Sequence, residues 1–344
     1  MTTVYLVRHA EAEGNLYRRA QGHYNGVTTP RGFRQIAALA HRFDSVHLDA
    51  VYSSDLIRTR ATALAAYWTH HLPLRTDPVF REVCMGEWEN KTWAQIEQFD
   101  GYELEKFNTD CEHWSVKGGE PIAEAGERML GGLRRVIAAH PGETIAVFSH
   151  GMAMRTLIGL LGGLTYCEID HTPHMENTAV TKLEAEDGEI RIVYKNDASH
   201  LTDDLATLKG QAWIRDARGF EGGIWYEPKK SGYSVCSPEG VIGEVSLGRI
   251  DGKTAELGNL ELIERARGRH LGSRLIGQAI VAAREQGCDT LRWVIPKENA
   301  QLVHMAEKDG AVLVRETDKA AVYERYFEFT EEYGIAQLRS ILGR

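Results

Sequence analysis

Two histidines and two arginines stand out in the first half of the sequence, because each comes shortly after an apolar run typical of a buried strand. They are Arg8, His9, Arg58 and His150. An imidazole can attack a phosphorus atom in line, while guanidinium groups and a second imidazolium hold the phosphoryl oxygens and neutralise charge in the transition state. If the fold brings these four side chains together, the set is suited to phosphoryl transfer.

Such a reaction also needs an acid for the leaving oxygen. Glu82 is the first choice, because it lies in a short loop with glycine and tryptophan between the second and third of these strands. Glu87 and Glu89 lie in the same loop. The residue types alone favour Glu82 but leave the other two open.

Three strand-and-helix units are expected to position these groups. The expected strands cover residues 4–7, 49–53 and 144–148, and the expected helices cover residues 30–40, 54–64 and 152–161. Ser54 is expected to cap the second helix. Right-handed crossovers place the carboxyl ends of parallel strands along one edge of a sheet, where ligands bind in open α/β folds. We therefore expect the strand ends that carry the four side chains to meet there.

Length and composition exclude several classes of protein. A chain of 344 residues predicts two domains, and 43% hydrophobic with 26% charged residues is typical of a globular protein. We expect a cytoplasmic protein without a membrane partner, because no apolar run approaches about 20 residues and no signal peptide is evident. The five cysteines never form a Cys-x-x-Cys pair, which favours reduced thiols. A net charge of −9 argues against nucleic-acid binding and makes a cationic pocket a local feature for a small anion.

Residues 1–201 resemble the histidine phosphatase superfamily, also called the phosphoglycerate mutase-like family. Four blocks carry the resemblance in order: residues 6–11 with Asn15, residues 53–63, Glu82 with Gly86 and Trp88, and residues 149–151. The resemblance implies an α/β fold, with a three-layer α/β/α first domain over residues 1–201.

By this resemblance His9 is the transiently phosphorylated nucleophile, and Glu82 acts as acid and then as base toward water. Arg8, Arg58 and His150 form the phosphate pocket. Further substrate contacts are expected from Asn15, Gln21, Gly22 and Gly151. No metal or cofactor is required, and the histidines of residues 171–174 are interpreted as part of a loop.

The expected substrate is a small phosphorylated metabolite. Mutases of the family carry a longer insertion than the interval 88–117 found here, which favours a phosphatase over the alternative, a mutase-type phosphotransferase. Aromatic residues of the same interval form either core or a substrate lid: Trp93, Phe99, Tyr102, Phe107 and Trp114.

A second domain is expected from residue 202 to residue 344, after a polar break at residues 202–204. Residues 204–232 have no clear period and receive no assignment. Residues 241–247 and 254–263 predict two strands joined at Asp251-Gly252, a strong hairpin signal. A basic, glycine-containing loop then opens a helix that runs to about residue 286. Its backbone N–H groups are suited to a pyrophosphate, although a basic helix cap on a solvated face gives the same pattern.

Residues 205–330 resemble the GCN5-related N-acetyltransferase (GNAT) family, which implies an α+β domain, an acetyl-CoA cofactor and a small amine acceptor. The implied cofactor-binding residues are Arg267, Gly268, Arg269, His270, Leu271, Gly272, Ser273 and Asn299. The sequence departs from the family pattern, because His270 replaces the usual first glycine and Ala306 stands where a tyrosine is common. Glu256 or Glu261 are candidate bases, and His304 is a candidate acid.

Two hypotheses follow for the whole chain. In the first, a phosphatase is fused to an acetyltransferase in one bifunctional enzyme. In the second, the GNAT-like domain is a non-catalytic module that senses acyl-CoA or pairs with another subunit. The sequence predicts no oligomeric state.

Overall fold

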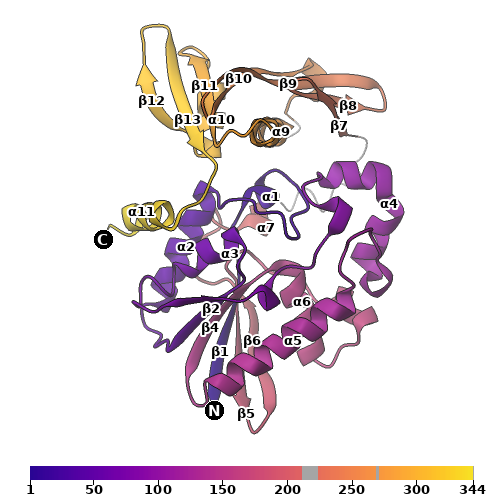
Figure 1. Ribbon diagram of the computed structural model, residues 1–344, viewed down its shortest axis with the longest axis vertical. Coiled ribbons are helices and arrows are strands. Elements are labelled where there is room, and N and C mark those ends of the chain that lie inside the picture. Colours follow the sequence, from indigo (N-terminus) through magenta and orange to yellow (C-terminus); the bar gives the residue numbers. More distant parts are fainter. Residues whose placement is uncertain (211–223, 269–270, 344) are drawn as a thin grey trace.

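The structure is a computed structural model that describes residues 1–210, 224–268 and 271–343, arranged as two stacked domains (Figure 1). The first domain contains a six-stranded sheet in the order β3-β2-β4-β1-β5-β6, in which β5 pairs antiparallel with both β1 and β6 and the other neighbouring strands pair parallel. The strands are β1 (Thr2–Arg8), β2 (Ala50–Ser53), β3 (Leu74–Thr76), β4 (Thr144–Ser149), β5 (Val180–Glu186) and β6 (Glu189–Asp197).

Helices cover both faces of this sheet. They are α2 (Pro30–Phe43), α3 (Ile57–Ala63), α5 (Ile122–Ala139) and α6 (Gly151–Leu161). Leu6 and Val147 pack with α5 and α6, whereas their neighbours Val7 and Ala146 pack with α2 and α3. Successive residues of a strand point to opposite faces, so alternate positions of β1 and β4 supply two separate apolar cores. The expected three-layer α/β/α fold is confirmed.

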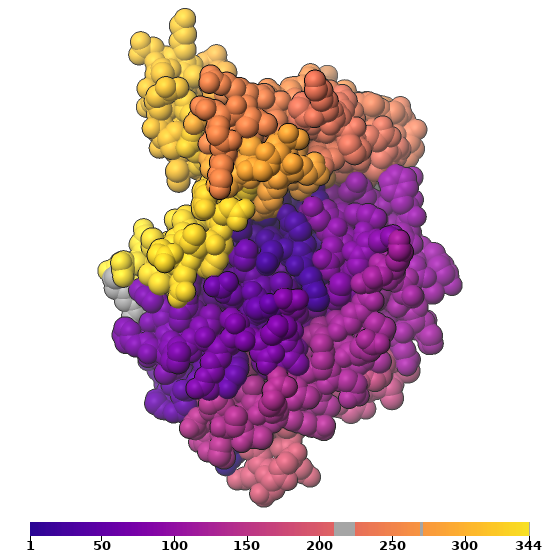
Figure 2. Space-filling model, in the orientation of Figure 1, coloured from indigo at the N-terminus to yellow at the C-terminus, as the bar shows by residue number. Residues whose placement is uncertain are grey.

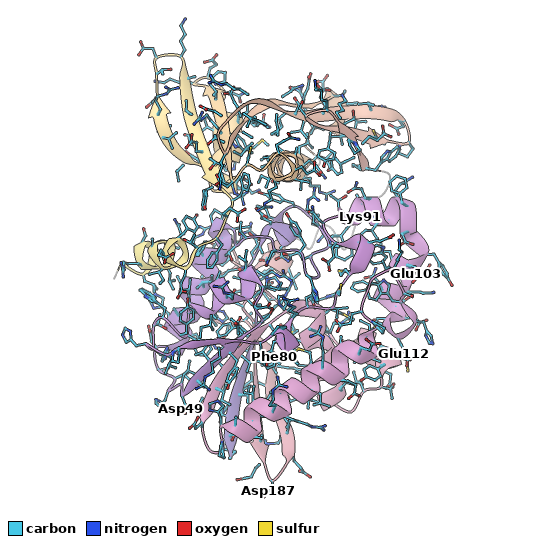
Figure 3. All side chains as sticks on the ribbon, viewed as in Figure 1. Asp49, Phe80, Lys91, Glu103, Glu112 and Asp187 are labelled. Carbon is cyan, nitrogen blue, oxygen red and sulfur yellow. The ribbon has the colours of Figure 1, made fainter. Side chains whose placement is uncertain are left out.

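Further elements connect these layers. They are α1 (Glu13–Leu16), α4 (Trp93–Thr109), α7 (Thr207–Gly210), and the 3₁₀ turns η1 (Pro78–Phe80), η2 (Gly86–Trp88), η3 (Cys111–His113) and η4 (Tyr166–His171). Phe80 at the end of η1 is fully buried between the sheet and α5, whereas Glu103 and Glu112 lie at the periphery (Figure 3). No helix among the described residues is long and apolar enough to cross a membrane.

The helix predicted over residues 54–64 is wrong at its N-terminal end. Helix α3 begins only at Ile57, and its N-cap is Leu56, whose side chain makes no capping bond. Ser54 does not cap the helix. Its hydroxyl accepts the backbone N–H of Leu56 at 3.2 Å and contacts Nε2 of His150 at 2.9 Å.

The second domain contains a seven-stranded sheet in the order β12-β13-β11-β10-β9-β8-β7. Its strands are β7 (Trp225–Lys229), β8 (Gly232–Ser237), β9 (Gly240–Asp251), β10 (Thr254–Leu262), β11 (Thr290–Pro296), β12 (Val312–Glu316) and β13 (Ala320–Tyr326), and its other elements are η5 (Glu264–Ala266), α9 (Leu271–Glu285) and α10 (Ala300–Asp309). The hairpin predicted at Asp251-Gly252 joins β9 to β10, and Gly252 has a φ of +59°. The expected α+β organisation is confirmed.

Strands β10 and β11 are parallel but pair only at their beginnings. The paired residues run from Thr254 with Thr290 to Glu256 with Arg292, although both strands continue for several residues. Beyond the last paired residues, backbone hydrogen bonds no longer hold the two strands together, so the strands can separate there. The end of β10 that no longer pairs with β11 lines a cleft of the second domain, to which Leu260 and Leu262 contribute.

The two domains share a packed interface beneath this sheet. Tyr17 of the first domain belongs to the apolar core of the second, and a Cβ placed on Gly277 of α9 would lie 2.6 Å from Cγ of Tyr17. The last helix, α11 (Glu331–Leu342), returns to the first domain and packs on α2 (Figure 1). The boundary between residues 201 and 202 stays a prediction, and residues 211–223 of the unassigned stretch 204–232 lie outside the described residues.

Candidate active site

The strand ends meet at one edge of the first sheet, as the crossover rule predicts. Arg8 of β1 stands opposite Ser149 of β4, and the backbone N–H of His9 donates to the Ser149 carbonyl at 2.9 Å. The rings of His9 and His150 consequently lie 5.4 Å apart between centroids. Arg8, His9, Arg58 and Glu82 line a cavity of about 160 Å³, and His150 is fully buried beside His9.

The surroundings of His9 determine which ring nitrogen carries the lone pair. Its Nδ1 lies 2.7 Å from the carbonyl oxygen of Ala10, and a carbonyl can only accept, so Nδ1 carries the proton. The lone pair is therefore on Nε2. Burial, together with the guanidinium groups of Arg58 and Arg8, lowers the pKa of His9 well below 6.5. The ring is neutral near pH 7, the form required of a nucleophile.

Two buried guanidinium groups provide a cationic cradle. Arg58 donates to the carbonyls of Gly22 at 2.7 Å and Tyr24 at 2.9 Å, and Arg8 donates to the carbonyl of Met175. The Nε atoms of Arg8 and Arg58 are buried without an acceptor among the described residues. Burial lowers the pKa of Arg58 to about 10, so the group stays charged near pH 7. Buried cations with unused N–H groups are suited to binding an oxyanion.

His150 differs from its expected charge state. Burial and the nearby Arg58 lower the pKa of His150 well below 6.5, so the neutral ring is favoured instead of the expected imidazolium. Its Nε2 contacts the Ser54 hydroxyl at 2.9 Å, and Nδ1 is buried without a partner among the described residues. A phosphate dianion beside this ring favours its protonated form, because an opposite charge stabilises a cation.

The position of Glu82 separates it from its two competitors. One carboxylate oxygen accepts the backbone N–H of Ala153 at 2.8 Å and the other that of Met152 at 3.1 Å, which fixes the carboxylate at the start of α6. Glu87 forms an exposed ion pair with Lys117, and Glu89 accepts backbone N–H groups of the loop. Of these three carboxylates, only Glu82 is among the described residues that line the cavity.

The other expected substrate contacts also lie on the cavity wall: Asn15, Gln21, Gly22 and Gly151. Gly22 has a φ of +48°, a conformation that glycine adopts without strain, and its carbonyl holds Arg58. At the start of α6 a Cβ on Gly151 would lie 3.3 Å from Nε of Arg8, so glycine keeps the space beside that guanidinium open.

Three arginines that were not predicted from the sequence lie on the same wall: Arg18, Arg19 and Arg155. Arg19 is 5% exposed, and its Nε and one terminal nitrogen have no acceptor among the described residues. The adjacent pair Arg18-Arg19, close behind the first block, was the available signal. A charged pair in a polar segment normally lies in solvent, which is why the pattern alone did not distinguish it.

The aromatic interval 88–117 serves as both core and wall. Trp93 and Phe107 line the cavity and pack with the rings of Trp88 and Trp114. Phe99 and Tyr102 are instead 69% and 71% exposed. Helix α4, which carries most of these residues, has a non-helical backbone at Asp100.

A group with possible metal ligands lies near the active-site loop. His23, Cys84 and Glu89 bring ligand atoms within 4.8 Å of one another. Oε1 of Glu89 already accepts the backbone N–H groups of His23 and Met85, at 2.8 and 3.1 Å. We infer that these three side chains stabilise the loop.

A larger cavity of about 670 Å³ lies at the cleft of the second domain. The expected cofactor residues that line it are Arg267, Gly268, Leu271, Gly272, Ser273 and Asn299, whereas Arg269 and His270 lie outside the described residues. Gly268 has a φ of +72°, and a Cβ on Gly272 would lie 2.7 Å from Cε of Met305. The size, the glycines and the start of the 15-residue helix α9 fit a nucleotide cofactor.

Two of the expected acetyltransferase groups are present in this cavity. Glu261 and His304 line it, and Glu256 is not among its described lining residues. Ala306 is fully buried in the apolar core, so it takes no part in the cleft. The amide oxygen of Asn299 caps α10 by accepting the backbone N–H of Leu302 at 3.1 Å.

Comparison with known proteins defines the class of both domains. The histidine phosphatase superfamily (branch 1) matches residues 4–198, and the acetyltransferase (GNAT) family matches residues 196–311. The chain belongs to the histidine phosphatase superfamily, and a GNAT domain follows the phosphatase domain. It is an enzyme of that superfamily.

Individual relatives match the first domain. Phosphoserine phosphatase 1 of Hydrogenobacter thermophilus is 32% identical over 171 residues, which is 48% of this chain and 78% of the relative. A probable phosphoglycerate mutase, GpmB, of Cronobacter sakazakii is 33% identical over 48% of this chain and 76% of its own length. The solved structure of YhfR from Bacillus stearothermophilus has 30% identity and a TM-score of 0.57, and the match covers 58% of this chain and 99% of YhfR.

The depressed pKa of the two active-site histidines predicts a pH dependence of stability. Both groups titrate near pH 6.5 when unfolded but bind protons only at lower pH when folded, so the unfolded state binds more protons below about pH 6.5. Folding stability should therefore fall as the pH drops below that value. Urea unfolding between pH 7.5 and 5 tests this, with kcat/KM declining in the same direction as His9 is protonated.

Two variants control this prediction. His9→Gln should make the acid-side loss of stability less steep, whereas His47→Gln should leave it unchanged, because His47 is exposed. Identical curves for all three proteins would contradict the assignment of the effect to the buried site.

Proposed function

We propose that the first domain is a metal-independent phosphomonoesterase that works through a phosphohistidine. Nε2 of His9 attacks phosphorus while the phosphorus–oxygen bond to the leaving alcohol breaks, and Glu82 gives the leaving oxygen a proton. Water then attacks phosphorus, the nitrogen–phosphorus bond breaks, and Glu82 takes the proton of the water. The hydrogen bond from Nδ1 of His9 to the Ala10 carbonyl supports this most directly, because it leaves Nε2 available.

Three side chains form the phosphate pocket in this proposal. Arg8 and Arg58 hold the phosphoryl oxygens with charge-assisted hydrogen bonds, and His150 joins them when it is protonated. Asn15 and the backbone N–H of Gly151 supply further contacts, and Gln21 and Gly22 line the entrance. These donors are fixed by packing, so little reorganisation is needed when negative charge develops.

We further propose that the substrate is a small phosphomonoester with a carboxylate. Arg18, Arg19 and Arg155 add positive charge to the wall of a cavity of only about 160 Å³. The printed names of the relatives, phosphoserine phosphatase and phosphoglycerate mutase, fit such compounds. Phosphate release from phosphoserine and 3-phosphoglycerate should exceed release from glycerol phosphate, which carries no carboxylate. Equal kcat/KM for all three would contradict this substrate class.

Mutase activity is a second candidate function, because several relatives are named probable phosphoglycerate mutases. A mutase returns the phosphoryl group to a second hydroxyl, whereas a phosphatase gives it to water. Phosphorus NMR of 3-phosphoglycerate incubated with the protein separates them. Inorganic phosphate without 2-phosphoglycerate supports the phosphatase, and the isomer supports the mutase.

Glu82→Gln should discriminate between substrates by their leaving groups. An alkoxide needs a proton as it leaves, whereas a nitrophenolate does not, so hydrolysis of an alkyl phosphate should fall about 10²-fold or more. Hydrolysis of p-nitrophenyl phosphate should fall much less if phosphorylation of His9 limits its rate. Glu87→Gln is the matched control and should leave both activities unchanged, because Glu87 is exposed. An equal loss on both substrates would show that Glu82 is not the proton donor.

For the second domain we propose acetyl-CoA binding and transfer of the acetyl group to a small amine. The divergence of β10 from β11 beside the start of α9 supports the cofactor site. Bound acetyl-CoA would supply the activated thioester. Glu261 is placed to take the proton of the amine, and His304 to protonate the leaving thiolate.

Calorimetry with acetyl-CoA and a thiol-release assay over an amine panel test this proposal. Binding with thiol release supports the bifunctional enzyme. Binding without turnover of any amine supports the alternative, a non-catalytic module that senses acyl-CoA.

A further inference from the structure

One wall of the 670 Å³ cavity comes from the phosphatase domain. Glu11, Leu16, Arg18 and Arg31 line it together with residues of β10, α9 and α10. In the space-filling view the second domain lies directly over the N-terminal segment of the chain, coloured indigo (Figure 2). The cavity is thus built by both domains, although the cleft itself belongs to the second.

The lining of this cavity is cationic. Its described positively charged residues are Arg18, Arg31, Arg267, Arg274 and Lys308. The described carboxylates are only Glu11 and Glu261, in a chain whose net charge is −9. A concave, positively charged wall concentrates the field on an anion.

Arg31 is held at this wall by a buried carboxylate. Its guanidinium lies 3.3 Å from Oε2 of Glu11, and Oε1 of Glu11 accepts the Thr29 hydroxyl at 2.6 Å. The Glu11 side chain is 2% exposed and that of Arg31 27%. Glu11 is therefore fixed, and it orients a partly accessible guanidinium toward the cavity that Arg31 lines.

We propose that Arg31 of the phosphatase domain binds a phosphate group in the nucleotide part of acyl-CoA. The start of α9 receives one part of this polyanion, and Arg31 provides a second donor across the cavity. The acyl-CoA site is then a property of the fused chain and not of the GNAT domain alone. This proposal rests on the proposed acetyl-CoA binding.

Calorimetry of the full-length protein with acetyl-CoA tests the proposal. Arg31→Met should weaken acetyl-CoA binding about 10-fold or more, because it removes a charge-assisted hydrogen bond to a phosphate group. Arg34→Met is the matched control, because Arg34 lies on the same helix but is exposed and is not among the lining residues. Its Kd should equal that of the wild type.

Arg31→Lys keeps the charge and should retain part of the affinity, which separates phosphate binding from lost packing. Thermal unfolding of each variant verifies that it is folded. If the wild type binds acetyl-CoA and the Arg31→Met and Arg34→Met variants bind it equally well, the role of Arg31 is wrong and the cofactor assignment stands. If the wild type does not bind acetyl-CoA, both the cofactor assignment and this inference fail.

Discussion

Replacing His9 with alanine is expected to lower the hydrolysis of p-nitrophenyl phosphate by at least about 10³-fold, because the variant has no nucleophile to form the phosphoenzyme. The remaining arginines would still bind the phosphate, so the loss should appear mainly in kcat. Mass spectrometry of protein quenched during turnover should show a phosphorylated histidine in the wild type and none in the variant.

The variant should remain folded. Burial and two guanidinium groups lower the pKa of His9, and the neutral imidazole makes one internal hydrogen bond to Ala10, so its removal costs little beyond a small cavity. Circular dichroism provides the check. His47→Ala removes an exposed imidazole and should leave activity intact. Full activity in His9→Ala would overturn the proposed mechanism.

The sequence predicted the strand ends of the active site because their signal is local. An apolar run that ends in Arg8 and His9 indicates a buried strand with polar groups at its carboxyl end. The topology of parallel strands then brings His150 beside them, although they are about 140 residues apart. Four sequence blocks in the expected order make this prediction specific.

The same reasoning could not predict which groups meet across the domains. Tyr17 donates to Asp309, 292 residues later in the chain, and no periodicity links these positions. The cationic wall of the second cavity was missed for the same reason, because Arg31 lies in a helix of the first domain. The start of α3 was also mispredicted, since Ser54 has the sequence signature of a cap but its hydroxyl contacts His150 instead.

A buried ionic network holds the two domains together beside the active site. Glu13 accepts Arg284 at 2.9 Å and Arg325 at 3.1 Å, and Arg325 also donates to Asp309 at 2.7 Å. The Arg325 side chain is 4% exposed, and those of Glu13 and Asp309 are 2% exposed. The two carboxylates of this network balance the charge of its two guanidinium groups. Glu13 begins α1, which also carries Asn15 of the proposed phosphate pocket.

Arg325→Met is expected to destabilise the protein by about 3–5 kcal/mol, because it leaves a buried carboxylate without its cation. Urea unfolding of the full chain measures the loss. Arg315→Met on the exposed strand β12 is the control and should change stability by less than about 0.5 kcal/mol. At temperatures where Arg325→Met stays folded, KM for the phosphomonoester should also rise, since α1 loses one of its anchors.

A second substitution distinguishes lost charge balance from lost packing. Asp309→Asn alone leaves an excess cation, but combined with Arg325→Met it restores neutrality, because Glu13 keeps Arg284 as its partner. The double variant should therefore be more stable than the sum of the single losses predicts, by about 1–3 kcal/mol in a double-mutant cycle. Additive losses would mean that the network contributes through packing alone, and that the GNAT domain does not hold the phosphate site through these charges.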